Sequence, residues 1–411
     1  MVFRCAHPQR LVLVSSVNPF VQAWSMDAIL YGHMALRYWR RASSLGGLGS
    51  LGAFASLCPR DMRDEAQPRR RSSVDVRPPS PEVLGRLEAL GLFGAEEPCH
   101  LLVTDASSRR LRGNVVCHAW EGPVPARQLL PLATGGMGLT EVFVSSPELL
   151  LVQLAAEGID GIEWLSLALE LCGSYRLVDG ELHTKCPQLT SGKRVLALAC
   201  QLAGRRGVAL CKRMARWALD GSGSPAETAL AISLGLPHRL GGCNLGPLEL
   251  NRELELGEEG RAILGRDTIT PDILVPFART RRGVPGHPIE YDSTRWHSTQ
   301  EQGDYDEMRR NAYASLGMAC TILRPRHLRS AWKFDVMAAA IRKNAGRRVR
   351  DLPAGFDEAH RLLLEKTLAP WARRRPGRAG DDGFDDENRD FCAIPGSEDA
   401  CFDPLDWPDA F

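Results

Sequence analysis

The stretch that decides the fold class is TPDILVPFARTRRGVPGHPIEYD, residues 270–292. Two apolar runs, DILVPFA and HPIEYD, flank a turn rich in arginine and glycine, which predicts two strands joined as a hairpin. Side chains two residues apart share one side of a strand, so Glu290 and Asp292 are expected on one face. The hairpin would also bring Asp272, at the start of the first strand, near Glu290.

These acids predict a metal site. Carboxylates gathered at one end of a sheet repel one another, and each is costly to hold charged without a compensating cation. Mg²⁺ supplies that charge and takes carboxylate oxygens and water as ligands, and Mn²⁺ is the alternative. Such a metal can stabilise a phosphoryl transition state and activate water. His297, five residues beyond Asp292, could then act as an acid or a base.

The segments around the hairpin predict an α/β order. Upstream, GSGSPAETALAISLGL begins a helix after Gly221, and LELNRELEL (248–256) alternates like a strand. Downstream, DYDEMRRNAYASLG from Asp304 predicts a helix and MACTIL (318–323) a strand. Helix, three strands, helix and strand is an α/β arrangement.

The rest of the chain divides by composition and rhythm. Ser80 and Ser146 each precede a proline and cap a predicted helix, with short strands between the two helices. The expected parts are an irregular segment (1–73), an α+β, mostly helical domain (74–220), the α/β domain (221–335), a basic helical segment (336–380) and an acidic, disordered tail (381–411).

Composition narrows the class of protein. The 411 residues carry 51 Lys and Arg against 50 Asp and Glu, so overall charge does not indicate a partner. The 12 cysteines form no C-x-x-C pair, which favours reduced thiols in a cytoplasmic protein. No apolar run approaches the roughly 18 residues of a membrane helix. The apolar core LVLVSSV near the start is short and broken by Asn18 and Pro19, which is not typical of a signal peptide.

The motifs after residue 220 carry a resemblance. PDILVP, then IEYDSTRWH, then DYDEMRRNAYASLG resemble uncharacterised bacterial families related to the very-short-patch repair endonucleases, within the PD-(D/E)xK restriction-endonuclease-like superfamily. The match covers about 110 residues, from Ser224 to Leu328. The upstream region is loosely similar to actinobacterial proteins related to abortive-infection antitoxins. The resemblance implies a mixed sheet flanked by helices.

The resemblance also implies roles for individual residues. Asp272, Glu290, Asp292 and His297 fall on the catalytic positions, and Glu227 matches a helix-borne metal ligand, so the implied metal ligands are Glu227, Asp272 and Glu290. Asp292 stands where the superfamily has lysine, and Ser293 where these families have glycine. No cation on this strand would therefore orient the attacking water.

Each acid has a structural alternative. Ser224 and Glu227 fit a capping box, in which the glutamate serves its own helix. Asp272 could accept hydrogen bonds from a turn at the start of its strand. Glu290 and Asp292 could form an exposed pair matched by nearby arginines, namely Arg281, Arg282 or Arg295.

The basic residues also have more than one expected role. Arg281, Arg282, Arg309 and Arg310 are candidate phosphate contacts, but the last two could instead pair with Asp304 or Asp306 along their helix. His297 could simply pack beside Trp296. The runs RKNAGRRVR (342–350) and RRRPGR (373–378) could bind nucleic acid or pair with the acidic tail.

The sequence therefore favours a metal-dependent DNA endonuclease, acting in DNA repair or phage defence. The alternative is a non-catalytic nucleic-acid-binding or antitoxin-like regulatory protein that keeps the fold. DNA is the expected partner in the first case, a toxin or defence-system protein in the second.

Overall fold

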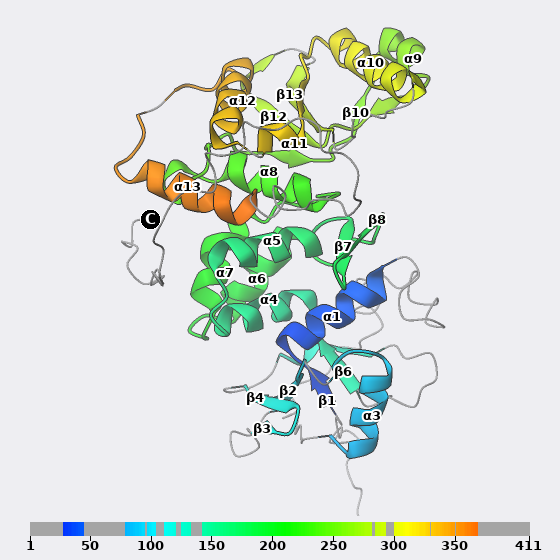
Figure 1. The fold of residues 1–411 in the computed structure, drawn as a ribbon, viewed down its shortest axis with the longest axis vertical. Coiled ribbons are helices and arrows are strands. Elements are labelled where there is room, and N and C mark those ends of the chain that lie inside the picture. The colour runs from blue at the N-terminus through cyan, green and yellow to red at the C-terminus, as the bar shows by residue number, and fades with distance from the viewer. Residues whose placement is uncertain are drawn as a thin grey trace, which may run out of the picture. The chain divides into compact units, whose positions relative to one another are not determined.

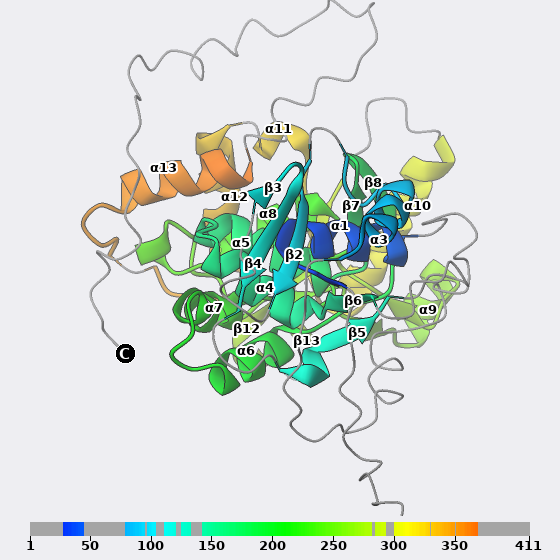
Figure 2. The ribbon, with the colours of Figure 1, turned by 90° about the horizontal axis from the view of Figure 1, so that it is seen from below.

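A six-stranded mixed sheet forms in the N-terminal half of the chain. Its order is β3-β4-β2-β1-β6-β5, in which β1 pairs parallel to β6 and β2 parallel to β4 (Figures 1 and 2). The strands are β1 (Ala28–Leu30), β2 (Cys99–Val103), β3 (Leu111–Arg112), β4 (Val115–Ala119), β5 (Leu129–Pro131) and β6 (Val142–Ser145).

The computed structural model describes residues 28–44, 79–94, 97–103, 111–120, 125–132, 142–281, 284–292, 300–328, 330–349 and 351–368. All of them belong to one unit, which ends at Arg373. The predicted tail, 381–411, lies outside the described residues.

Residues 28–43 correct the expectation of an irregular N-terminal segment. β1 lies inside the sheet, and α1 (Gly32–Ser43) follows it at once. Helix α1 buries Met34 and Trp39, and the Trp39 indole donates to the Ser145 carbonyl at 2.9 Å. The residues on both sides of this helix show no regular hydrophobic pattern. The composition of the segment therefore did not predict the helix.

Helices dominate residues 147–217, as expected. Ser80 Oγ and Ser146 Oγ accept from backbone N–H groups in the first turns of α3 and α4, which confirms both predicted caps. The helices are α3 (Pro81–Ala89), α4 (Pro147–Ala156), α5 (Gly161–Leu171), α6 (Gly192–Gln201) and α7 (Val208–Met214). A hairpin of β7 (Tyr175–Val178) and β8 (Glu181–Thr184) was not predicted.

A second, four-stranded mixed sheet holds the predicted hairpin. Its order is β14-β13-β12-β9, with β9, β12 and β13 antiparallel and β14 parallel to β13. Strands β12 and β13 are labelled in Figure 1. The elements are α8 (Pro225–Gly235), β9 (Glu249–Leu250), β12 (Ile273–Arg281), β13 (Val284–Tyr291), α10 (Gln300–Ser315) and β14 (Thr321–Leu323). The expected α/β class is confirmed.

The stretch LELNRELEL is not one strand. It breaks into β9 and β10 (Leu254–Glu255), which belong to different sheets, and β10 pairs with β11 (Thr268–Ile269). Asn251, at φ +48°, turns the chain between them. Asparagine tolerates the left-handed region, so the alternation continues across a bend that a strand pattern cannot reveal. Helix α9 (Glu258–Leu264) lies between β10 and β11.

The four-stranded sheet is buried on both faces. Ile273, Val275 and Ile289 join the main hydrophobic cluster with side chains of α8, α12 (Ala331–Asn344) and α13 (Phe356–Thr367). Leu274 joins a smaller cluster with residues of α9 and α10. The main cluster also includes side chains from α4 and α5, so one core runs across residue 221, where the domain boundary stays a prediction.

Two further sequence expectations can be compared with the described residues. The eight cysteines there are all free thiols; six are buried, Cys320 is partly buried and Cys200 is exposed. Among the helices that the structure describes, none has the length and apolar character needed to cross a membrane.

Candidate functional site

The register of β12 and β13 places Asp272 beside Glu290. Ile273 lies opposite Ile289, so the residues just outside this pair, Asp272 and Glu290, face each other across the hairpin. The Tyr291 backbone N–H donates to Asp272 Oδ2 at 2.7 Å. Asp272 is therefore fixed to the neighbouring strand, not to a turn at the start of its own.

Glu227, at the start of α8, is part of a capping box. The Glu227 N–H donates to Ser224 Oγ at 3.2 Å, and the Ser224 hydroxyl donates to Glu227 Oε1 at 2.9 Å. The other oxygen, Oε2, accepts from the Gly223 N–H at 2.8 Å and from Asn251 Nδ2 at 2.6 Å. The side chain is 8% exposed. The capping alternative is confirmed, and it holds this carboxylate at the edge of the acidic group.

Glu290 has a cationic partner that the sequence analysis did not assign. Arg309 Nη2, on α10, donates to Glu290 Oε1 and to the Thr270 carbonyl, and the buried Tyr313 hydroxyl donates to the same glutamate oxygen. The side chains of Arg309 and Glu290 are only 22% and 18% exposed. Arg309 therefore pairs with the strand acid instead of with Asp304 or Asp306.

The three acids act on one another electrostatically. Burial, followed by the charges of Glu290 and Glu227, raises the pKa of Asp272 to about 7. Burial also raises the pKa of Glu227, and Glu290 adds to this against three hydrogen bonds that lower it. Burial lowers the pKa of Arg309, but Glu290 and Tyr313 more than compensate, so it is raised. The group therefore has three carboxyl groups, and the single guanidinium of Arg309 can balance the charge of only one of them.

Asp292, at the end of the strand, has a different cationic partner from Glu290. Its N–H donates to the Leu323 carbonyl of β14 at 2.9 Å, and its carboxylate pairs with Arg324 Nε at 3.2 Å. Arg324 was not among the arginines proposed to match it. The signal that could have found it is the parallel β13–β14 register, in which Tyr291 lies opposite Leu323.

Of the remaining predicted residues, only Arg310 has a side chain that the structure describes. His297 and Arg282 lie outside the described residues, as does the side chain of Arg281. Arg310 is exposed, and its Nε donates to the Asp306 carbonyl at 3.3 Å within its own helix.

The carboxylate oxygens of Asp272, Glu290 and Glu227 do not all lie within 4.8 Å of one another. Among the described His, Cys, Asp and Glu side chains, the group whose ligand atoms all lie within 4.8 Å of one another is a different one: His100, His118 and Glu157. Within this acidic group, Glu290 accepts a hydrogen bond from the Arg309 guanidinium, and Glu227 accepts one from the Asn251 amide.

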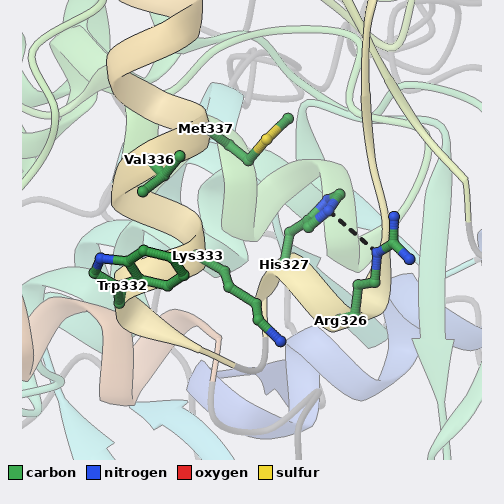
Figure 3. Close-up of a pocket in the computed structure, with 6 residues that line it drawn as sticks. All are labelled: Arg326, His327, Trp332, Lys333, Val336 and Met337. Atoms are coloured by element: carbon green, nitrogen blue, oxygen red, sulfur yellow. Dashed lines mark hydrogen bonds between the residues drawn. The ribbon is translucent and has the colours of Figure 1, made fainter.

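A basic, aromatic pocket of about 330 Å³ lies where α11 (Pro325–Leu328) meets α12 (Figure 3). Trp332 is 71% exposed beside Lys333, and His327 and Arg326 line the pocket from α11, with Arg326 on the far side of His327 from Trp332 (Figure 3). Burial lowers the pKa of His327, and so do the nearby charges of Arg326, Arg324 and Lys333. The Arg324 backbone N–H donates to His327 Nδ1 at 3.1 Å, and the side chain of the same arginine pairs with Asp292.

In comparisons with known proteins, no family model, no curated protein and no solved structure matches the chain.

Proposed function

We propose that residues 221–335 form a restriction-endonuclease-like domain that cleaves phosphodiester bonds of DNA with Mg²⁺ or Mn²⁺. The observation that carries the proposal is the position of Asp272 beside Glu290, where the charges of Glu290 and Glu227 raise the pKa of Asp272. The order α8, β9, β12, β13, α10 and β14, with β14 parallel to β13, supports it.

Asp272, Glu290 and Glu227 are the ligands that we propose, because hard divalent ions prefer carboxylate oxygens. To reach one ion, these carboxylates would have to move closer together than they lie in this structure. When bound, the ion would polarise a phosphoryl oxygen and lower the pKa of attacking water. Arg309 supplies a cation beside Glu290, whereas the strand itself carries Asp292 at the position where the resemblance expects lysine. Tyr313 fixes the Glu290 carboxylate by a second hydrogen bond.

Trp332 and its basic neighbours would receive the nucleic acid. Aromatic side chains stack on bases of any sequence, and Lys and Arg side chains contact the phosphates. The exposed Trp332 ring, next to Lys333 and Arg326, combines both features. This surface supports an unpaired strand as the ligand better than an intact duplex, in which base faces are covered.

The test is cleavage of plasmid, single-stranded and mismatched DNA by the full chain with Mg²⁺ or Mn²⁺. We expect Asp272→Asn and Glu290→Gln to abolish cleavage, while Arg310→Gln, on the exposed side of α10, retains it. Cleavage that survives the double substitution Asp272→Ala and Glu290→Ala would overturn the proposed site.

A second candidate is a nucleic-acid-binding or antitoxin-like regulatory protein without turnover. The observation that favours it is the engagement of Glu290 by Arg309 and Tyr313, which satisfies this carboxylate without a metal. Calorimetry separates the candidates: the nuclease requires Mn²⁺ binding that is lost in Asp272→Asn, whereas the regulatory protein binds DNA without any such dependence on Mn²⁺.

A further inference from the structure

Two histidines and a glutamate come together in the N-terminal half, away from the acidic group. His100 on β2 lies opposite Val116 on the parallel strand β4, so His118, two residues further on, shares its face of the sheet. His100 Nδ1 and His118 Nε2 are 2.8 Å apart. Glu157 Oε1, just beyond the last residue of α4, lies 3.6 Å from His118 Nδ1. Figures 1 and 2 both show β2 and β4 side by side.

Glu157 stands where helix electrostatics disfavour an acid. The C-terminal end of a helix carries partial negative charge, so cations are the stabilising neighbours there. Glu157 is the C-cap residue of α4. Its ion-pair partners in the part of the chain that the structure describes are His118 and, at 3.9 Å, His33. A bound cation would supply the charge that this position lacks.

The surroundings hold the imidazoles in place. The Tyr31 ring stacks on His118, with ring centroids 4.1 Å apart and an angle of 14° between the planes. Gly32, at φ +51°, lets the chain pass close to the acid, since a Cβ there would lie 3.1 Å from Glu157 Oε1. The approach of backbone and carboxylate therefore depends on glycine at the start of α1.

We propose that His100, His118 and Glu157 bind a divalent transition metal of the zinc class. Imidazole nitrogens suit Zn²⁺, Co²⁺ and Ni²⁺, whereas Mg²⁺ prefers oxygen. One ligand atom from each of the three side chains lies within 4.8 Å of the others, so a small adjustment of the side chains would bring them to the spacing of about 3.3 Å between ligands of a tetrahedral zinc ion. Two histidines and one carboxylate leave a fourth position for His33 or for a water molecule.

The test uses the full chain, stripped with a chelator and titrated calorimetrically with Zn²⁺. We expect about one Zn²⁺ per chain, the count for a single site of this kind. The double variant His100→Gln and His118→Gln should lose this binding, whereas His183→Gln, a histidine of the β7–β8 hairpin, should keep it. Titration with Co²⁺ should give the visible absorption of a four-coordinate site in the wild-type chain and in His183→Gln, but not in the double variant.

Glu157→Gln tests the site without changing a sheet residue, and it should weaken Zn²⁺ binding by at least about tenfold, as expected when a charged ligand is lost. Asp272→Asn with Glu290→Gln should leave Zn²⁺ binding intact, which keeps this inference independent of the proposed nuclease site. Wild-type binding in a folded double-histidine variant, or no Zn²⁺ binding by the wild-type chain, would overturn the assignment.

Discussion

The Arg309 guanidinium, on α10, donates to the Glu290 carboxylate, at the end of β13, and so ties a helix to the edge of the four-stranded sheet. Both side chains are mostly buried, and the same guanidinium nitrogen also reaches the Thr270 carbonyl at 3.0 Å. This cation is the counter-charge that the proposed metal would supplement.

Arg309→Gln should therefore destabilise the folded chain. The substitution leaves a partly buried carboxylate without its cation, which costs about 2–3 kcal/mol once partial exposure is allowed for. Urea denaturation followed by circular dichroism measures this change. The matched control is Arg310→Gln, since Arg310 is exposed one position further along α10 and should change stability by less than about 0.5 kcal/mol. Equal effects of the two substitutions would contradict a specific role for Arg309.

The raised pKa of Asp272 predicts a pH dependence. Its pKa rises from 3.8 to about 7 in the folded chain, so the folded state binds this proton more tightly than the unfolded state. The contribution is fully present below about pH 4 and is lost as the pH rises through 7. Asp272→Asn should flatten the decline of stability over this interval by roughly 1–3 kcal/mol. An unchanged slope in thermal unfolding from pH 5 to pH 8 would show that Asp272 ionises freely.

His287 predicts the opposite slope in acid. The ring is 2% exposed, its Nε2 lies 2.8 Å from Thr321 Oγ1, and burial lowers its pKa from 6.5 to about 4. The unfolded chain gains the proton first, so stability is intact above about pH 6.5 and falls as the pH drops toward 4. The loss reaches at most about 3 kcal/mol. His287→Gln should reduce this acid sensitivity, measured by urea midpoints, whereas His183→Gln should not.

Stacking on the exposed Trp332 ring should contribute to the affinity for single-stranded nucleic acid. Stacking of one base is worth about 1–3 kcal/mol, so Trp332→Ala should weaken binding of a fluorescent single-stranded oligonucleotide by roughly 5- to 150-fold. Val336→Ala removes another exposed apolar side chain from the same pocket and should leave affinity nearly unchanged. If both variants bind as the wild type does, the pocket is not where the strand lies.

The sequence predicted the hairpin and the neighbouring acids because both depend on local pattern and strand register. It did not predict the partners of the acids. Arg309 reaches Glu290 from helix α10, and Arg324 reaches Asp292 from the residue just after β14. Both contacts depend on tertiary packing. The same holds for the group of His100, His118 and Glu157, which stand far apart in sequence and have no motif spacing.

Residues 28–43 show a different limit. β1 is three residues long, and its place inside the sheet depends on pairing with strands more than 70 residues downstream. A run of three apolar residues carries no strand signal by itself. Its burial follows from those distant partners.

Substitutions in the capping box of α8 distinguish two roles of Glu227, which are capping its helix and binding the proposed metal. Ser224→Ala removes the hydroxyl that accepts from the Glu227 N–H, which should cost about 1 kcal/mol of stability, but it leaves the carboxylate held by Gly223 and Asn251. Mn²⁺ affinity should therefore stay within about twofold of the wild type. Glu227→Gln keeps the shape but removes the charge, and it should lower Mn²⁺ affinity about tenfold if the carboxylate is a ligand. Calorimetry on the two variants, paired with their thermal midpoints, gives both quantities. If Ser224→Ala lowers Mn²⁺ affinity as much as Glu227→Gln does, Glu227 acts on the metal only by capping its helix.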